Sequence, residues 1–246
     1  MAMSFVQISE VIERSTQGKT RPFLCKDENG QSYYVKGRGA GFRTLCCEWV
    51  ASQLAMRCNL PVAPPRVVCV PEPLVQQSYI PDILDLDTGL AFGSSKIENV
   101  GDLRRNDVKN VDSDLAMRVL AFDWWIANSD RLQAKDVSGP NNPNLLWDVH
   151  NKQLHVIDHN NAFTLKEIHK FSDHTFISFW DKWDAKWKND FDELRHKAYE
   201  DIDEIWWEMP EKWIDNEELR NDGITLDKVK TVLERFNNED FWNRTF

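Results

Sequence analysis

Three oxygen-bearing side chains in the middle of the chain have the types and spacing of a divalent-cation site. Asp130 follows an apolar run, Asn144 begins a short apolar segment, and Asp158 ends the next such segment. If the two segments pair as a hairpin, the start of one and the end of the other meet, so Asn144 and Asp158 can share a cation with Asp130 close by. Carboxylate and amide oxygens suit Mg²⁺. The pattern indicates phosphoryl transfer, in which a carboxylate must also receive or position the proton of the nucleophile.

A lysine and a glutamate upstream supply further parts of such a site. Lys36 ends the β-prone run Ser32–Lys36, and Glu48 lies in the next helical segment. An ammonium can hold nucleotide phosphates, and a carboxylate can orient that ammonium. Taken singly, each residue is more often a solvated surface charge. The order of strand lysine, helix glutamate, further strands and helical region favours a nucleotide site.

The segment Ser15–Thr20 lies between the first predicted strand and the strands around Lys36, where a loop that covers the phosphates belongs. It contains one glycine, Gly18, and no G-x-G-x-x-G pattern. Backbone N–H groups and hydroxyls in such a loop can still bind phosphate. Gly18 is therefore a candidate nucleotide contact.

Turn and periodicity signals predict the elements that position these residues. Asn29-Gly30 between two β-prone runs predicts a hairpin. Apolar residues at helical spacing predict a helix over residues 45–56. Arg66–Val70 and Val75–Ile80 are predicted to be neighbouring strands, and Phe92–Ser95 is predicted to be a turn.

The second half of the chain is predicted to be mostly helical. A helix is expected over Ser113–Ala127, followed by two short strands, Leu145–Trp147 and Leu154–Ile157. After residue 163 the pattern is helical, with a break at Pro210. Of the eleven tryptophans, seven lie in this last region, where thick aromatic packing of a helical core is the main interpretation and a partner-binding surface the alternative.

Composition sets the broad class. The chain has 246 residues, with 41% hydrophobic and 28% charged residues, which is typical of a globular protein. It lacks both a signal-peptide pattern and an apolar run of about 18 residues. Five cysteines without a C-x-x-C pattern fit reduced thiols, so we expect a cytoplasmic protein. A net charge of −10 argues against nucleic-acid binding, and no basic amphipathic helix favours a membrane surface.

The three motifs resemble those of the HipA-like kinases, whose large lobe also resembles the phosphoinositide kinases. Members tend to carry N-x-D-R, then N-[L/I]-[L/I], then I-D-H-G. The chain has Asn128-Ser129-Asp130-Arg131, Asn144-Leu145-Leu146 and Ile157-Asp158-His159-Asn160. Pro210-Glu211-Lys212-Trp213 is similar to a late P-x-x-W of related members. The resemblance covers most of the chain, and residues 128–163 carry its specific part.

This resemblance implies an α+β, bilobal protein-kinase-like fold. A small β-rich N-lobe with one helix is expected over residues 1–90, and a larger, mostly helical C-lobe over residues 91–246. The resemblance implies ATP and Mg²⁺ as cofactors and a Ser or Thr of a protein as acceptor. It assigns the roles of acid/base to Asp130, metal ligands to Asn144 and Asp158, phosphate-binding lysine to Lys36, its partner to Glu48, and a further phosphate contact to Arg43.

Departures from the family pattern leave alternatives open. The interval from Asp130 to Asn144 is longer than usual, so Asn141 or Asn142 could be the ligand instead, and Asn160 replaces the glycine of I-D-H-G. The glycine-poor phosphate loop and the Trp-rich acidic C-terminal region leave room for a pseudokinase that acts as a binding module. A kinase of a small molecule or of a lipid headgroup is a further alternative. A protein substrate is the expected partner, and the resemblance adds an antitoxin or a small neighbour-encoded protein.

Overall fold

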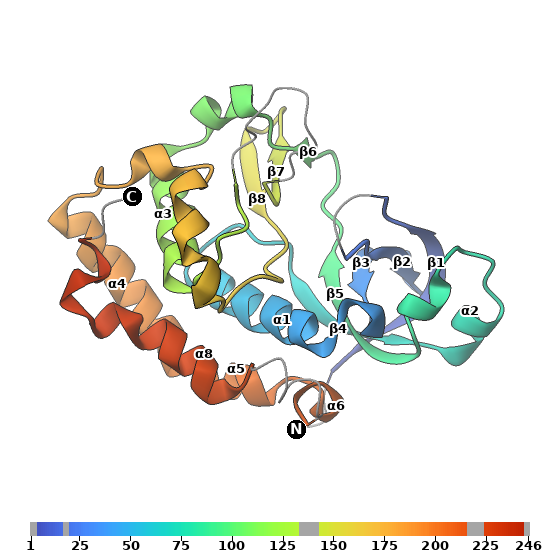
Figure 1. Cartoon of the computed structure of the whole chain (residues 1–246). Coiled ribbons are helices and arrows are strands. Elements are labelled where there is room, and N and C mark those ends of the chain that lie inside the picture. Colours follow the sequence, from blue (N-terminus) through green and yellow to red (C-terminus); the bar gives the residue numbers. More distant parts are fainter. Residues whose placement is uncertain (1–3, 17–19, 133–142, 216–223, 244–246) are drawn as a thin grey trace.

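A strand-rich N-terminal part is followed by a helical C-terminal part (Figure 1), as the α+β prediction required. The computed structural model describes residues 4–16, 20–132, 143–215 and 224–243. A closed barrel in the order β1-β2-β3-β5-β4 is made by β1 (Val6–Arg14), β2 (Phe23–Asp27), β3 (Ser32–Lys36), β4 (Pro65–Val70) and β5 (Gly89–Ser95). The boundary expected at residue 90 stays a prediction, and β5 runs across it.

The predicted hairpin around Gly30 is confirmed. β2 and β3 pair antiparallel with Phe23 opposite Val35, and Gly30 adopts a φ of 78°, which glycine reaches without strain. The Asp27 carboxylate accepts hydrogen bonds from the backbone N–H groups of Asn29 and Gln31, each at 2.9 Å. This turn fixes the register of β3, whose last residue is the buried Lys36.

Two predictions for the segment after β4 are wrong. Val75–Ile80 is not a strand, because the chain forms the short helix α2 (Glu72–Gln76), which has a proline in its first turn. Phe92–Ser95 is not a turn but part of β5, the true neighbour of β4. A Cβ at Gly93 would lie 2.5 Å from Cγ1 of Val68, so the glycine that suggested a turn instead permits close strand packing.

The predicted helix that carries Glu48 is confirmed as α1 (Phe42–Arg57). Eleven of its residues are buried, because it packs between the barrel and the C-terminal helices. Those that it contacts are α4 (Ala185–Glu200), α5 (Ile202–Trp207) and α6 (Glu211–Ile214). The predicted break at Pro210 is confirmed between α5 and α6, and α8 (Leu226–Leu233) lies beside α5 (Figure 1).

The helix and hairpin that frame the predicted cation site are also confirmed. α3 (Ser113–Trp125) is capped by Asp112, whose carboxylate accepts the N–H of Leu115 at 3.0 Å. A second sheet has the order β6-β7-β8 and consists of β6 (Gly101–Asp102), β7 (Leu145–Asp148) and β8 (Gln153–Val156). In the β7–β8 hairpin Leu145 lies opposite Val156, so the residues that flank them, Asn144 and Ile157, meet at one end.

The tryptophans mainly build the core, which confirms the main interpretation of that region. Trp183 and Trp187 stack with ring centroids 5.4 Å apart, whereas Trp207 is 67% exposed. The buried members are Trp49, Trp124, Trp125, Trp147, Trp180, Trp183, Trp206 and Trp213. No helix in the described part of the chain is both long enough and apolar enough to cross a membrane.

Candidate active site

Lys36, Glu48 and Asp158 meet although they lie far apart in the sequence. The Lys36 ammonium forms ion pairs with Glu48 Oε1 and, at 2.8 Å, with Asp158 Oδ1. The second oxygen of Glu48 accepts the backbone N–H of His159 at 3.0 Å. Both Lys36 and Glu48 are buried. The end of β3, the middle of α1 and the loop after β8 thus converge on one ammonium group.

Burial and the mutual charges set the protonation of this group of three. Burial lowers the pKa of the Lys36 ammonium, but Glu48 and Asp158 outweigh it, and the pKa lies above its ordinary value. Burial raises the pKa of Asp158, yet Lys36 and the hydrogen bonds hold that pKa at about 2. Burial also raises the pKa of Glu48; Lys36 opposes this shift and the charge of Asp158 adds to it. Lys36 and Asp158 are therefore both charged at neutral pH.

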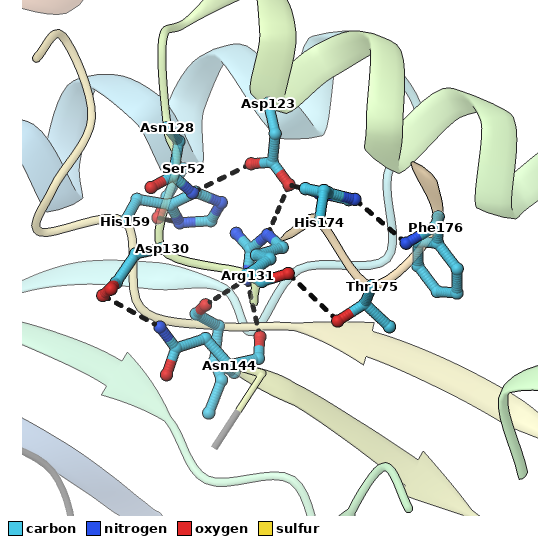
Figure 2. Close-up of polar contacts among 11 residues, drawn as sticks. Ser52, Asp123, Asn128, Asp130, Arg131, Asn144, His159, His174, Thr175 and Phe176 are labelled. Atoms are coloured by element: carbon cyan, nitrogen blue, oxygen red, sulfur yellow. Dashed lines mark hydrogen bonds and ion pairs between the residues drawn. The ribbon is translucent and has the colours of Figure 1, made fainter. Parts of the chain in front are cut away.

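Asp130 and Asn144 are brought together next to this group. Asn144 Nδ2 lies 3.4 Å from Asp130 Oδ2 and donates to it (Figure 2). The backbone O of Asn144 accepts the N–H of Ile157 at 3.1 Å, which ties Asn144 to the residue before Asp158. Asn144 and Asp158 both have a φ of 56°, a left-handed conformation that Asn and Asp tolerate better than most residues. Both predicted ligands therefore lie at the open end of the β7–β8 hairpin, in left-handed backbone conformations.

A buried arginine holds the backbone at this end of the hairpin. Arg131 Nη1 donates to the backbone O of Asn144 at 2.7 Å and to that of Ile157 at 2.8 Å (Figure 2). Its Nε donates to Asp123 Oδ2 at 2.6 Å. Arg131, the neighbour of Asp130, thus bonds the backbone at Asn144 and at the residue before Asp158. One guanidinium group therefore ties together the segments that carry the three candidate side chains.

Asp123 is the centre of this network, and the sequence analysis did not single it out. It lies in α3 and is fully buried. Besides Arg131, its carboxylate accepts from Asn128 Nδ2 at 2.9 Å and from His174 Nε2 at 3.1 Å. His174 Nδ1 accepts the N–H of Phe176, so the ring proton must be on Nε2. The signal available in the sequence was an acid inside the apolar run Phe122–Ile126.

Burial would raise the pKa of Asp123, but the charge of Arg131 and the hydrogen bond from His174 outweigh it, and the pKa is lowered. Burial lowers the pKa of His174, although Asp123 opposes the shift. The network is therefore a buried ion pair between Asp123 and Arg131 that a neutral histidine supports.

A first cavity, of about 450 Å³, has the Lys36 group at one end. Its lining includes Lys36, Glu48 and Asp158, together with the apolar side chains of Ala63, Phe92, Leu146, Ile157 and Val156. A volume of this size suits a nucleotide-sized ligand. Charged groups for phosphates and apolar walls for a base are thus available in one space.

The described residues of the predicted phosphate loop border this cavity. Ser15 and Thr20 both line it. Gly18 lies outside the described residues, as do Asn141 and Asn142, so their proposed contacts stay predictions.

Arg43 lies at a second cavity, of about 590 Å³, which Asp130 also lines. Its guanidinium donates to the backbone O atoms of Asn160 and Ala162, at 3.1 and 3.2 Å, and to Thr164 Oγ1 at 2.7 Å. These bonds hold the loop that follows Asp158. A contact between Arg43 and the nucleotide phosphates stays a prediction, since Arg43 does not line the first cavity.

The donor set fits Mg²⁺ better than a softer metal. Asp158 offers a carboxylate and Asn144 an amide oxygen, and no sulfur or imidazole lies among the predicted ligands. In the described residues no group of three or more His, Cys, Asp and Glu side chains is arranged to hold a metal by itself. A Mg²⁺ ion at such a site is held by one or two protein oxygens and by substrate phosphates.

The fold and the two carboxylates beside a buried lysine define a kinase-like phosphotransferase. A family model described as "HipA-like kinase" matches residues 8–245, and the chain belongs to this family. The chain is similar to a solved structure, that of the Helicobacter pylori proinflammatory kinase CtkA. The similarity covers 96% of this chain and 93% of the CtkA chain, with 12% sequence identity and a TM-score of 0.45. No curated protein sequence matches the chain.

Proposed function

We propose that the protein is a Mg²⁺- and ATP-dependent kinase that phosphorylates an alcohol, with a Ser or Thr side chain of a protein as the leading acceptor. The observation that carries this proposal is the ion-paired group of Lys36, Glu48 and Asp158 at one end of the first cavity. A buried lysine shared by two carboxylates is the arrangement that positions nucleotide phosphates beside a metal ligand.

Each residue then has a defined task. Lys36 holds the nucleotide phosphates, and Glu48 orients the ammonium. Asp158 and Asn144 would hold Mg²⁺, which when bound offsets negative charge on the phosphates. Asp130 lies beside Asn144 and faces the second cavity, where an acceptor hydroxyl can approach.

The reaction needs one proton acceptor. A bond forms between the acceptor oxygen and the γ-phosphorus, the bond to the β–γ bridging oxygen breaks, and the hydroxyl proton passes to Asp130. ADP is the leaving group. The buried network of Asp123 and Arg131 holds the backbone next to Asp130 during this step, which favours a productive position of the acceptor hydroxyl.

Substitution of the two carboxylates tests the proposal. We expect Asp158→Ala to abolish transfer of ³²P from ATP, including autophosphorylation, because it removes a metal ligand. Asp130→Ala should lower transfer by a factor of about 10²–10⁴, the usual contribution of a general base. Asp190→Ala, which changes an exposed acid on α4, is the control. Full transfer by either of the first two variants, with folding verified by circular dichroism, contradicts the proposal.

A pseudokinase remains the second candidate, and ligand binding separates the two. A kinase should be stabilised against thermal unfolding by ATP only when Mg²⁺ is present. The free energy of unfolding should rise by about 2.7 kcal/mol at a ligand concentration one hundred times Kd. A module that does not bind nucleotide should gain none. Most of the tryptophans are buried, so they give this candidate less support than the sequence did, although Trp207 is 67% exposed.

A further inference from the structure

The charges of the second cavity are opposite to those of the chain as a whole. The chain carries a net charge of −10. The second cavity nevertheless has more cationic than anionic residues in its lining: its cations are Arg43, Lys166, Lys170 and Lys228, and its acids are Asp130 and Glu167. A local reversal of charge concentrates ligands of the opposite sign.

The first cavity has the opposite balance. Its acids are Glu48, Glu98, Asp102 and Asp158, and its cations are Lys36 and Lys96. An acidic lining suits a metal-bound nucleotide, since the metal ion supplies positive charge. The second cavity has to attract its ligand without that help, and its excess of cations selects an anion.

Two of the cations have their charge available. Lys166 and Lys228 are exposed, and neither forms an ion pair within the described part of the chain. Lys170, by contrast, is paired with Glu167 at 3.0 Å, and Arg43 donates to loop oxygens. Lys166 comes from the 3-10 helix Leu165–Asp173 and Lys228 from α8, so two separate elements contribute these cations to the cavity lining.

Asp130 places this cavity on the acceptor side of the proposed reaction. Asp158 lines the first cavity and Asp130 the second. Asn144 joins the two, because its side chain donates to Asp130 and its backbone O accepts from Ile157. A hydroxyl that approaches Asp130 from the second cavity thus faces phosphates bound in the first.

We propose that the second cavity binds an anionic acceptor, an alcohol that carries a phosphate or carboxylate group which Lys166 and Lys228 hold while its hydroxyl lies at Asp130. This inference rests on the proposed kinase function for the role of Asp130, but the anion site itself does not. The apolar residues Phe163, Leu165, Ile224 and Val229 line the same space and suit the carbon skeleton of the acceptor.

Binding of inorganic phosphate tests the anion site. Calorimetry is performed with a non-hydrolysable ATP analogue and Mg²⁺ at saturation, so that phosphate does not enter the first cavity. The wild-type protein should bind phosphate, and Lys166→Glu/Lys228→Glu should bind it at least about tenfold more weakly, since two charge-assisted contacts are reversed. Lys109→Glu/Lys152→Glu, with the same change in net charge at exposed sites outside both cavities, should bind as the wild type does. Absent binding in the wild type, or equal loss in both double variants, overturns the proposal.

Transfer assays then distinguish the source of the anion. A serine peptide flanked by Asp and Glu is compared with the same peptide flanked by Asn and Gln, and glycerol 3-phosphate is compared with glycerol. Faster transfer to an anionic member than to its neutral counterpart, lost in Lys166→Glu/Lys228→Glu, supports the proposal and identifies a protein or a small-molecule acceptor. Equal transfer within both pairs overturns it. If the wild-type protein binds phosphate but not the ATP analogue, the kinase function is refuted and the anion site is still supported.

Discussion

Replacement of Arg131 by lysine tests whether one guanidinium group holds the whole site. Lysine keeps the positive charge and can still pair with Asp123, but a single ammonium on a flexible chain cannot reproduce the three directed hydrogen bonds of Arg131. The two bonds from Nη1, to the backbone O atoms of Asn144 and Ile157, are the ones expected to be lost. Asn144 and Ile157, the residue before Asp158, would then each lose one backbone hydrogen bond.

The expected magnitude follows from what each carbonyl retains. Asn144 O still accepts from the N–H of Ile157 at 3.1 Å, so it loses one of two donors. Ile157 O loses the guanidinium donor with no other donor to it among the described residues. With about 0.5–1.5 kcal/mol for the first loss and about 1–3 kcal/mol for the second, the free energy of unfolding should fall by about 1.5–4.5 kcal/mol.

Urea denaturation and a nucleotide titration measure the two consequences. We expect Arg131→Lys to weaken Mg²⁺-dependent binding of an ATP analogue roughly tenfold, the change typical of a lost supporting contact near a metal ligand. Arg118→Lys is the matched control, because Arg118 makes only a partly exposed ion pair, at 2.7 Å, with Asp114 of α3. This substitution should lower the free energy of unfolding by at most about 1 kcal/mol. If both variants have wild-type stability and nucleotide affinity, the reasoning about Arg131 is refuted.

Two further predictions concern pH and the C-terminal helices. Burial lowers the pKa of His159 to about 3, so between this pH and 6.5 the unfolded chain binds more protons than the folded one. The free energy of unfolding should thus fall as the pH decreases through this range, by up to about 1.4 kcal/mol per pH unit, and urea titrations should show a smaller slope for His159→Gln but not for His150→Gln. Trp213→Ala should lower the free energy of unfolding by about 3–5 kcal/mol, since this fully buried ring contacts the core and Leu90. Trp207→Ala, at a largely exposed ring, should change it by less than about 0.5 kcal/mol in the same denaturation assay.

Local signals were sufficient for the parts of the fold that depend on neighbouring residues. Asn29-Gly30 specified the β2–β3 hairpin, and apolar spacing specified α1 and α3, because turn geometry and helical period are set within a few residues. The same signals failed at β5. Gly93-Ser94-Ser95 has the composition of a turn, and it is a strand because it pairs with β3 on one side and β4 on the other.

The residues of the candidate site could be predicted from the sequence, but the buried hydrogen-bond network that supports them could not. Lys36, Glu48 and Asp158 were each recognised from order along the chain, and the structure places them in contact. Asp123 and His174 were not recognised, since their importance comes from burial around Arg131, and burial depends on tertiary packing. A polar residue in an apolar helical run is the signal that single-sequence reasoning should weigh more heavily.

The two cavities separate the tasks that a phosphotransferase must combine. A nucleotide with its metal ion needs acids at its metal ligands, whereas the proposed anionic acceptor needs an excess of cations. The two cavities have opposite charge balances, with Asp158 in the lining of the acidic one and Asp130 in that of the basic one. Asn144 lies at the junction, bonded to Asp130 through its side chain and to Ile157 and Arg131 through its backbone. In the proposed reaction Asn144 links the nucleotide side to the acceptor side, and Arg131 holds its backbone O. We therefore expect a substitution in the buried network to lower the rate of transfer although no residue of that network contacts either substrate.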